Sequence, residues 1–166
     1  MMKSFTFLIL IFAILFNNTT ITAQDAKFQS LIIYNFTKLL DWPDKSGDFV
    51  VEVVGNPELA KELSDFTHNR KVNGVQNIVV KKVTPAELTN AQIIVVGLSY
   101  SDKLNDIIAK AGERNTLIVT EKSGLTKKGA GISLTKDKGT WHFQYNEDNI
   151  KKYGLKVSMD FRELGM

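Results

Sequence analysis

The feature that most constrains the fold of this chain is a series of short, β-branched apolar runs separated by stretches with helical periodicity. Residues 49–55 (FVVEVVG) and 91–97 (AQIIVVG) both end at a glycine, and residues 116–120 (TLIVT) form a third run. Runs this short and this continuously apolar are typical of strands buried on both faces. Because strands that alternate with helices need crossover connections, the sequence predicts a mostly parallel sheet with helices on both faces, a three-layer α/β sandwich.

Helices and a further strand are predicted between these runs. Apolar spacing predicts a first helix at 25–41. Asn56 and Pro57 suit the N-cap and first position of another helix. A half-exposed strand is expected at 75–83 and a helix at 99–111. The predicted inner side of the first helix consists of Phe28, Leu31, Ile32, Phe36, Leu39 and Leu40, and its polar side of Lys27, Ser30, Tyr34, Lys38 and Asp41.

The pattern changes after residue 120. Residues 131–135 and 140–145 read as an antiparallel hairpin turned by the polar residues 136–139. A short helix is predicted at 147–153, and a mainly helical segment at 157–164. The predicted fold is therefore an α/β sandwich that ends in an antiparallel hairpin.

The N-terminal residues have the layout of a secretory signal peptide. Lys3 precedes an apolar run at 5–16, and a polar stretch follows that ends at Ala23. The run is shorter than the roughly 20 residues that span a bilayer, so cleavage after Ala23 is predicted, with an uncleaved anchor as the alternative. The expected mature protein is a single soluble domain of residues 24–166 in an exported compartment.

Composition excludes several classes of function. The chain has no Cys, so lipid attachment at a mature N-terminal Cys, disulfides and thiol chemistry are excluded. Its formal net charge of +3 is too small to indicate a polyanion-binding patch, and nucleic acid is not an expected partner. Stability is therefore expected to come from packing and hydrogen bonds.

Motifs for catalysis or cofactor binding are not found in the sequence. The turn at 55–58 is not the glycine-rich turn of a dinucleotide site, since Pro57 removes a donor and Glu58 repels phosphate. Glu121 is a lone acidic residue after a strand and is expected to be solvated. Neither His68 nor His142 is followed by a second metal ligand at i+2, i+3 or i+4. We predict no catalytic residue, no metal and no cofactor, with an enzyme of unrecognised site as the least supported alternative.

Aromatic residues near the end of the first helix are the strongest candidates for a functional surface. Pro43 prevents helix continuation and holds Trp42 extended, and Tyr34 and Lys38 lie earlier on the same helix. Two interpretations remain open. Trp42 either closes the core over the helix end or contributes, with Tyr34 and Lys38, to a partner or ligand surface. For Trp141, Phe143 and Tyr145, which share one strand face, the core is favoured.

Residues 31–43 (LIIYNFTKLLDWP) resemble the opening motif of the YfiR-like family of periplasmic proteins. In that family an aromatic-Asn-Phe-x-Lys segment runs into Trp-Pro, and the matching residues here are Tyr34, Asn35, Phe36, Lys38, Trp42 and Pro43. The resemblance extends over essentially the whole mature chain and includes Phe143 and Asn146, which match a Phe-x-x-Asn pattern.

This resemblance implies an exported, non-enzymatic regulator that works by binding. In the family's best-understood role the domain restrains the periplasmic part of a membrane diguanylate cyclase, which lowers cyclic di-GMP and limits biofilm formation. A small-molecule-binding sensor module is the alternative, and a homodimer is one of the oligomeric states left open. The chain departs from better-known members in lacking their redox-linked cysteines. The candidate partner- or ligand-binding residues are Tyr34, Asn35, Lys38, Trp42, Pro43, Phe143 and Asn146.

Overall fold

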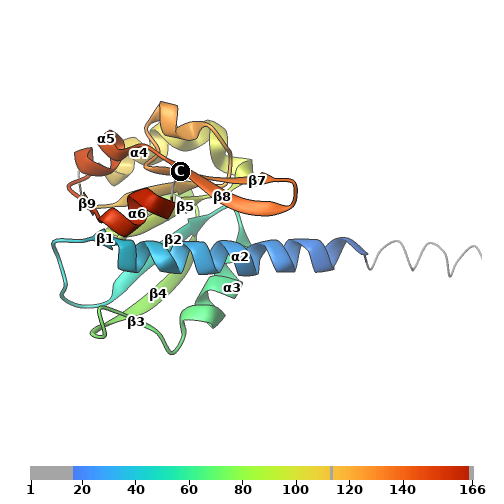
Figure 1. The fold of residues 1–166 in the computed structure, drawn as a ribbon, viewed down its shortest axis with the longest axis horizontal. Coiled ribbons are helices and arrows are strands. Elements are labelled where there is room, and N and C mark those ends of the chain that lie inside the picture. The colour runs from blue at the N-terminus through green and yellow to red at the C-terminus, as the bar shows by residue number, and fades with distance from the viewer. Residues whose placement is uncertain (1–16, 113, 165–166) are drawn as a thin grey trace, which may run out of the picture.

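A curled, seven-stranded sheet forms the centre of the molecule (Figure 1). The computed structural model describes residues 17–112 and 114–164, with side chains from residue 23 onwards. The strand order is β3-β4-β2-β5-β6-β7-β8, in which the five inner strands are parallel and both edge strands are antiparallel to their neighbours. The strands are β2 (Phe49–Val54), β3 (Lys71–Val72), β4 (Gln76–Val83), β5 (Ile93–Val96), β6 (Leu117–Thr120), β7 (Ile132–Asp137) and β8 (Thr140–Tyr145).

Helices cover both faces of this sheet, as the sequence predicts. One face carries α2 (Asn17–Leu39), α3 (Pro57–Thr67) and α6 (Met159–Leu164), and Figure 1 shows α2 crossing it between the other two. The other face is covered by α4 (Leu104–Ala111) and by 3-10 turns at Leu98–Lys103 and Leu125–Lys128. The remaining α-helix, α5 (Glu147–Lys152), follows β8. The predicted mostly parallel α/β architecture with a terminal hairpin is confirmed.

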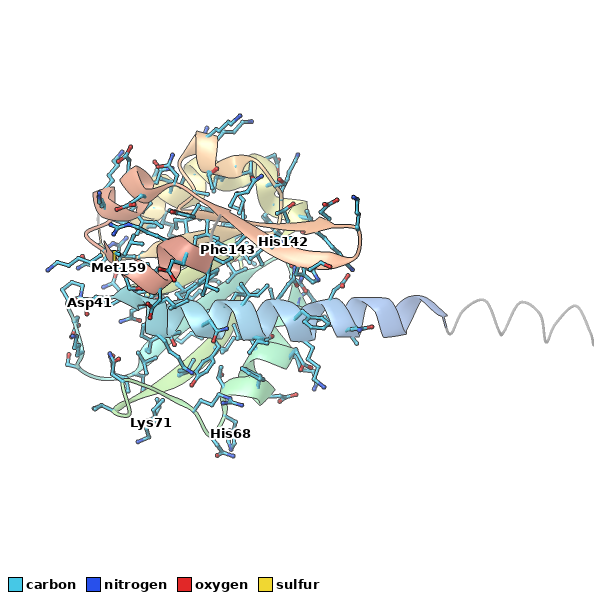
Figure 2. All side chains as sticks on the ribbon, in the orientation of Figure 1. Asp41, His68, Lys71, His142, Phe143 and Met159 are labelled. Atoms are coloured by element: carbon cyan, nitrogen blue, oxygen red, sulfur yellow. The ribbon has the colours of Figure 1, made fainter. Side chains whose placement is uncertain are left out.

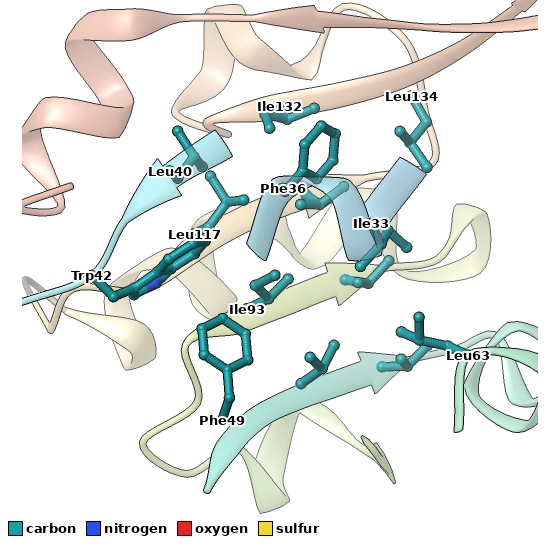
Figure 3. Close-up of a cluster of buried hydrophobic side chains, with 14 of the residues drawn as sticks. Ile33, Phe36, Leu40, Trp42, Phe49, Leu63, Ile93, Leu117, Ile132 and Leu134 are labelled. Carbon is teal, nitrogen blue, oxygen red and sulfur yellow. The ribbon is translucent and has the colours of Figure 1, made fainter. Parts of the chain in front are cut away.

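Strands β2, β5 and β6 each contribute to two separate cores because successive side chains point to opposite faces. In β5, Ile93 and Val95 pack beneath α2, whereas Ile94 and Val96 pack against α4, and all four are fully buried. Figure 3 shows the α2 side of this arrangement, with Phe36 above the strands. The apolar runs of the sequence are thus strands buried on both faces.

The end of α2 differs from the prediction of a helix through residue 41. The helix stops at Leu39, and β1 (Leu40–Asp41) then pairs antiparallel with β9 (Lys156–Val157). The Ser158 amide donates to the Leu39 carbonyl at 3.2 Å. Extended backbone is expected shortly before Pro43, but a strand here needs a partner more than 100 residues away in the sequence. That partner could not be read from the local pattern.

The hairpin of β7 and β8 turns more tightly than expected. Its two strands are joined by Lys138 and Gly139, with φ values of +46° and +85°. Positive φ at both central residues is the geometry of a type I′ hairpin turn. The hairpin is also attached to α2, since Trp141 Nε1 donates to Asp25 Oδ1 at 3.1 Å and Lys136 forms an ion pair with the same carboxylate. The hydrogen bond from Lys136 is the main cause that lowers the pKa of Asp25.

The buried side of α2 differs in part from the predicted one, although Phe36 and Leu40 are buried as predicted. Phe28 and Leu31 are 49% and 44% exposed, whereas Ser30 and Tyr34 are buried. The helix packs against α3 as well as the sheet, so the side of α2 that is buried depends on both contacts. Thr37 satisfies its buried hydroxyl by donating to the Tyr34 carbonyl at 2.7 Å. The assignment of Phe28 and Leu31 to the inner side was therefore wrong.

Candidate functional site

Trp42 belongs to the core, so its proposed role in an exposed surface is not supported. Its side chain is 4% exposed and meets Phe49 edge to face, with ring centroids 5.0 Å apart (Figure 3). Its indole Nε1 donates to the Gln92 carbonyl at 3.3 Å. Pro43 directly after it is exposed. Of the two interpretations open at the sequence level, Trp42 follows the one in which it closes the core at the end of α2.

Tyr34 is buried too, but it lies beneath charged side chains at the surface. Its ring is 7% exposed and packs edge to face on Phe66 of α3, with centroids 5.7 Å apart. Lys38 Nζ lies 4.6 Å from the ring centroid, and the Arg70 guanidinium carbon lies 5.2 Å from it. Such positions allow cation-π attraction. The structure thus brings Tyr34 and Lys38 together and adds Arg70.

A hollow of about 280 Å³ opens beside this group, between α2 and α3. Its lining consists of Lys27, Phe28, Leu31 and Phe66. Phe28 and Leu31 are the exposed large apolar residues of α2. We define the α2–α3 groove as this hollow together with its basic rim, and its members are Lys27, Phe28, Leu31, Tyr34, Lys38, Phe66 and Arg70.

The rim of the α2–α3 groove is positively charged. Within the described residues, Lys27, Lys38 and Arg70 take part in no salt bridge, whereas Lys61 on the same helix as Phe66 is paired with Asp65. Arg70 is held in place by a 3.0 Å hydrogen bond from Nε to the Phe66 carbonyl and by stacking on the Phe66 ring at 4.4 Å. The groove therefore offers apolar surface next to cations without a carboxylate partner.

Phe143 and Asn146 lie elsewhere and have structural contacts. Phe143 is partly buried on β8, where Figure 2 shows it beside α6, and its ring packs on Phe36 and Phe161 at 5.2 and 5.3 Å. Asn146 caps α5, since its Oδ1 accepts from the Asn149 amide at 3.1 Å. Asn35 is partly buried. These residues do not join Tyr34 and Lys38 in one site.

Sequence reasoning missed Phe66 and Arg70. Phe66 was detectable in principle, because it lies outside the inward stripe of α3 formed by Leu59, Ala60, Leu63 and Thr67. Arg70 follows the end of that helix by three residues and carried no local signal. Their proximity to Tyr34 comes from the packing of α2 on α3.

The sequence profile of a family described as YfiR/HmsC-like matches residues 26–165. The chain belongs to the YfiR/HmsC-like family. Members of this family are periplasmic regulators of diguanylate cyclase signalling. A search of curated proteins found no match to the chain. Among the helices of the described residues, none is long and apolar enough to span a bilayer.

In this YfiR/HmsC-like chain, the side chain of Glu121 occupies the position where doubly wound folds often bind ligands. The connections from β2 and β5 diverge after Gly55 and Gly97, which is a topological switch point. The Glu121 carboxylate lies between them and accepts from Asn56 Nδ2 at 2.6 Å and from the Leu98 amide at 3.2 Å. Glu121 is thus bonded and not simply solvated as expected, and a phosphate at this position would meet its charge.

Metal-ligating side chains are not clustered in the part of this YfiR/HmsC-like protein that the structure describes. No group of three or more His, Asp or Glu side chains suited to a metal ion occurs there. Figure 2 shows His68 beyond α3 and His142 on the hairpin, on opposite sides of α2. His142 is exposed, as its alternation with Trp141 and Phe143 predicts.

Proposed function

We propose that this protein is a non-enzymatic periplasmic regulator that binds and restrains a membrane signalling protein, in the leading case a diguanylate cyclase. Membership of the YfiR/HmsC-like family supports the regulatory role. Export with cleavage after Ala23 would remove the first residues of α2 and leave the α2–α3 groove intact, since its first member is Lys27. Restraint of the cyclase would lower cyclic di-GMP and limit biofilm formation.

The observation that carries the proposal is the exposure of Phe28 and Leu31 beside three cations that have no salt bridge among the described residues. Aromatic side chains and arginine are enriched where binding energy is concentrated in protein interfaces. A partner helix with apolar residues at i and i+3 or i+4 would fill the hollow between α2 and α3. Carboxylates flanking that stripe would pair with Lys27, Lys38 and Arg70.

The proposal is tested by restraint of cyclic di-GMP in cells that lack their own copy of the gene. Export of wild type should lower cyclic di-GMP, whereas Phe28→Ser with Leu31→Ser should weaken partner binding by roughly a hundredfold and abolish this effect. The matched control is Leu98→Ser with Met159→Ser, because these side chains are 65% and 69% exposed and lie outside the groove. Equal restraint by both variants, with equal export, would rule out the groove as the contact surface.

A second candidate function is a small-molecule sensor, which is favoured by a cavity of about 380 Å³ at the amino ends of β5 and β6. It is lined by Trp42, Asp44, Asn90, Ala91, Gln92, Arg114 and Asn115. Arg114 is anchored there by hydrogen bonds to Asn90 Oδ1 and, through Nε, to the Ala111 carbonyl. A carboxylate-bearing ligand would raise the melting temperature with concentration, and Arg114→Gln should remove that shift.

A further inference from the structure

A hollow of about 330 Å³ lies where α2 ends, against the paired strands β1 and β9 and the turn between β3 and β4. Figure 1 shows β1 and β9 at this end of the helix, and Figure 2 shows Asp41 just beyond it. The volume is within the roughly 300–1,000 Å³ of small-ligand pockets. The polar side chains that line the hollow are those of Lys38, Asp41, Lys45, Asn73, Lys156 and Ser158.

The charges around this hollow do not balance. Three lysines line it, whereas Asp41 is the single acidic residue of its lining among the described residues, so the lining carries a net charge of +2. Asp41 forms an ion pair with Lys45, with 3.1 Å between Oδ1 and Nζ. Lys38 and Lys156 take part in no salt bridge within the described part of the chain. Two ammonium groups therefore line the hollow without a carboxylate partner.

The pairing of β1 with β9 brings Lys156 to this place. Asp41 and Lys156 are directly opposite each other in the antiparallel ribbon, so their side chains leave it on the same face. Asp41 is nevertheless paired with Lys45, four residues further along the chain. A second hollow, of about 220 Å³, is lined by the same three charged residues together with Pro43 and Gly154. The three charged side chains thus border space on two sides.

Two uncharged side chains add hydrogen-bonding groups to the hollow. Ser158 Oγ accepts from the Phe161 amide at 3.1 Å, and this bond uses an oxygen lone pair and not the hydroxyl hydrogen. Asn73, in the turn between β3 and β4, adds a side-chain amide. Ammonium, hydroxyl and amide donors therefore surround one space.

The end of α2 opposes an anion here, but the opposition is weak. The carboxyl end of a helix carries about half a negative charge, spread over its last carbonyls. The Leu39 carbonyl at this end already accepts from the Ser158 amide at 3.2 Å, and Lys38 lies in the last turn. The lining's net charge of +2 outweighs this half charge.

We propose that this hollow binds a phosphate dianion through Lys38, Lys45 and Lys156, either as a free phosphate or as the terminal phosphate of a lipid headgroup. A phosphate monoester carries about −1.5 to −2 charges near neutral pH, which matches the charge of the lining. Lysine binds phosphate as a point charge, whereas arginine suits a planar carboxylate held by two bonds. The lining contains lysines and no Arg, which favours phosphate. The adjoining hollow of about 220 Å³ gives room for the group that carries the phosphate.

This site does not depend on the proposed contact with a membrane partner. Lys38 is the one residue that the hollow shares with the α2–α3 groove, so Asp41 and Lys156 are the positions to vary. Phe28→Ser with Leu31→Ser, which tests the groove, should leave phosphate binding unchanged. Failure of the phosphate site can therefore be distinguished from failure of the regulatory contact.

An NMR titration of the exported, processed protein with inorganic phosphate tests the site. Lys156→Gln should weaken binding by about tenfold, because it removes one charged donor. Asp41→Asn should strengthen binding by a similar factor, because it removes a repelling carboxylate and releases Lys45. The opposite sign for either variant would contradict the proposal.

The matched control variants change the same charges at a similar ion pair on α3. Lys61 and Asp65 are exposed and paired at the same spacing of four residues as Asp41 and Lys45, but they do not line the hollow. Lys61→Gln and Asp65→Asn should bind phosphate as wild type does. If they changed the affinity as much as Lys156→Gln and Asp41→Asn, the effect would come from overall charge and the proposed site would be wrong.

Vesicles distinguish a lipid headgroup from a free phosphate. Flotation with vesicles of about four parts phosphatidylcholine to one part phosphatidic acid is compared with flotation on phosphatidylcholine alone. Binding that requires phosphatidic acid and falls with Lys156→Gln would assign the phosphate to a lipid. Binding of inorganic phosphate without vesicle binding would assign it to a soluble molecule. A wild type that binds neither inorganic phosphate nor these vesicles would overturn the proposal.

Discussion

The two faces of the sheet are buried equally well but are built from different chemistry. On the α2 face the buried side chains of β2, β5, β6 and β7 are all apolar, and Phe36, Trp42 and Phe161 complete the cluster. On the α4 face the strands also bury Glu52, Thr120 and Ser133. Packing therefore dominates one core, whereas the other also depends on satisfying buried polar groups. Substitutions on the two faces should therefore destabilise the protein for different reasons.

The largest effect is expected on the α2 face, at Trp42. Trp42→Ala removes a buried ring and leaves a cavity beside Phe49, so the free energy of unfolding should fall by about 3–5 kcal/mol. Urea denaturation followed by circular dichroism measures this change. Trp42→Phe should lose less, since it keeps an aromatic ring and gives up the bond to Gln92. An unchanged midpoint for Trp42→Ala would return Trp42 to the surface interpretation.

A smaller loss is expected at Glu52 on the α4 face. Its carboxylate accepts from the Thr89 amide at 3.0 Å and from the Thr89 hydroxyl, and the residue is fully buried. Glu52→Ala should cost about 2 kcal/mol, because both donors of Thr89 lose their partner. A double-mutant cycle with Thr89→Val isolates the pair, and Glu52→Ala should cost much less in that background. Equal costs in both backgrounds would show that Thr89 is not its effective partner.

A still smaller loss of stability is expected on removing a member of the buried hydroxyl pair on the same face. Thr120 Oγ1 and Ser133 Oγ lie 2.9 Å apart between β6 and β7, and both residues are fully buried. Ser133→Ala should lower the free energy of unfolding by about 1 kcal/mol. Thr120 retains acceptors in the Lys122 carbonyl and, at 3.4 Å, the Ile132 carbonyl, which limits the loss. If Ser133→Ala lowered the free energy of unfolding as much as Trp42→Ala does, the proposed difference between the two faces would be wrong.

The smallest effect is expected outside both cores, at the link between α5 and α6. Arg162 donates to both oxygens of Glu147, at 2.7 and 3.1 Å, and chiefly this lowers the pKa of Glu147 from 4.5 to about 2. A lowered pKa in the folded state stabilises the protein above the ordinary carboxyl pKa. That contribution is lost as the pH falls from about 4.5 to about 2.

Unfolding midpoints measured across this pH range check the Glu147 prediction. Glu147→Gln should make the dependence of stability on pH shallower than in wild type. A matched control is Glu58→Gln, which removes an exposed carboxyl in the first turn of α3. Equal flattening by the two variants would show that the bond to Arg162 is not the cause.

The elements whose own residues form a clear hydrophobic pattern were predicted well. The runs at 49–55 and 91–97 became β2 and β5, since a strand buried on both faces is apolar regardless of its neighbours. The functional surface was predicted less well. Lys38 is exposed as expected, but Tyr34 and Trp42 are buried, and Phe28 and Leu31 are exposed instead. Periodicity marks the apolar side of a helix, but α2 packs against a second helix as well as the sheet.

The sequence by itself determined the class of fold, the parallel strands, the terminal hairpin and, through motifs spread along the chain, the YfiR-like family. These follow from local periodicity, turn residues and short motifs, which need no knowledge of distant contacts. Only the tertiary structure decided which arc of α2 faces outward, that Arg70 covers Tyr34, and that β1 pairs with β9. The physical reason is that burial and charge pairing are set by contacts between segments far apart in the chain.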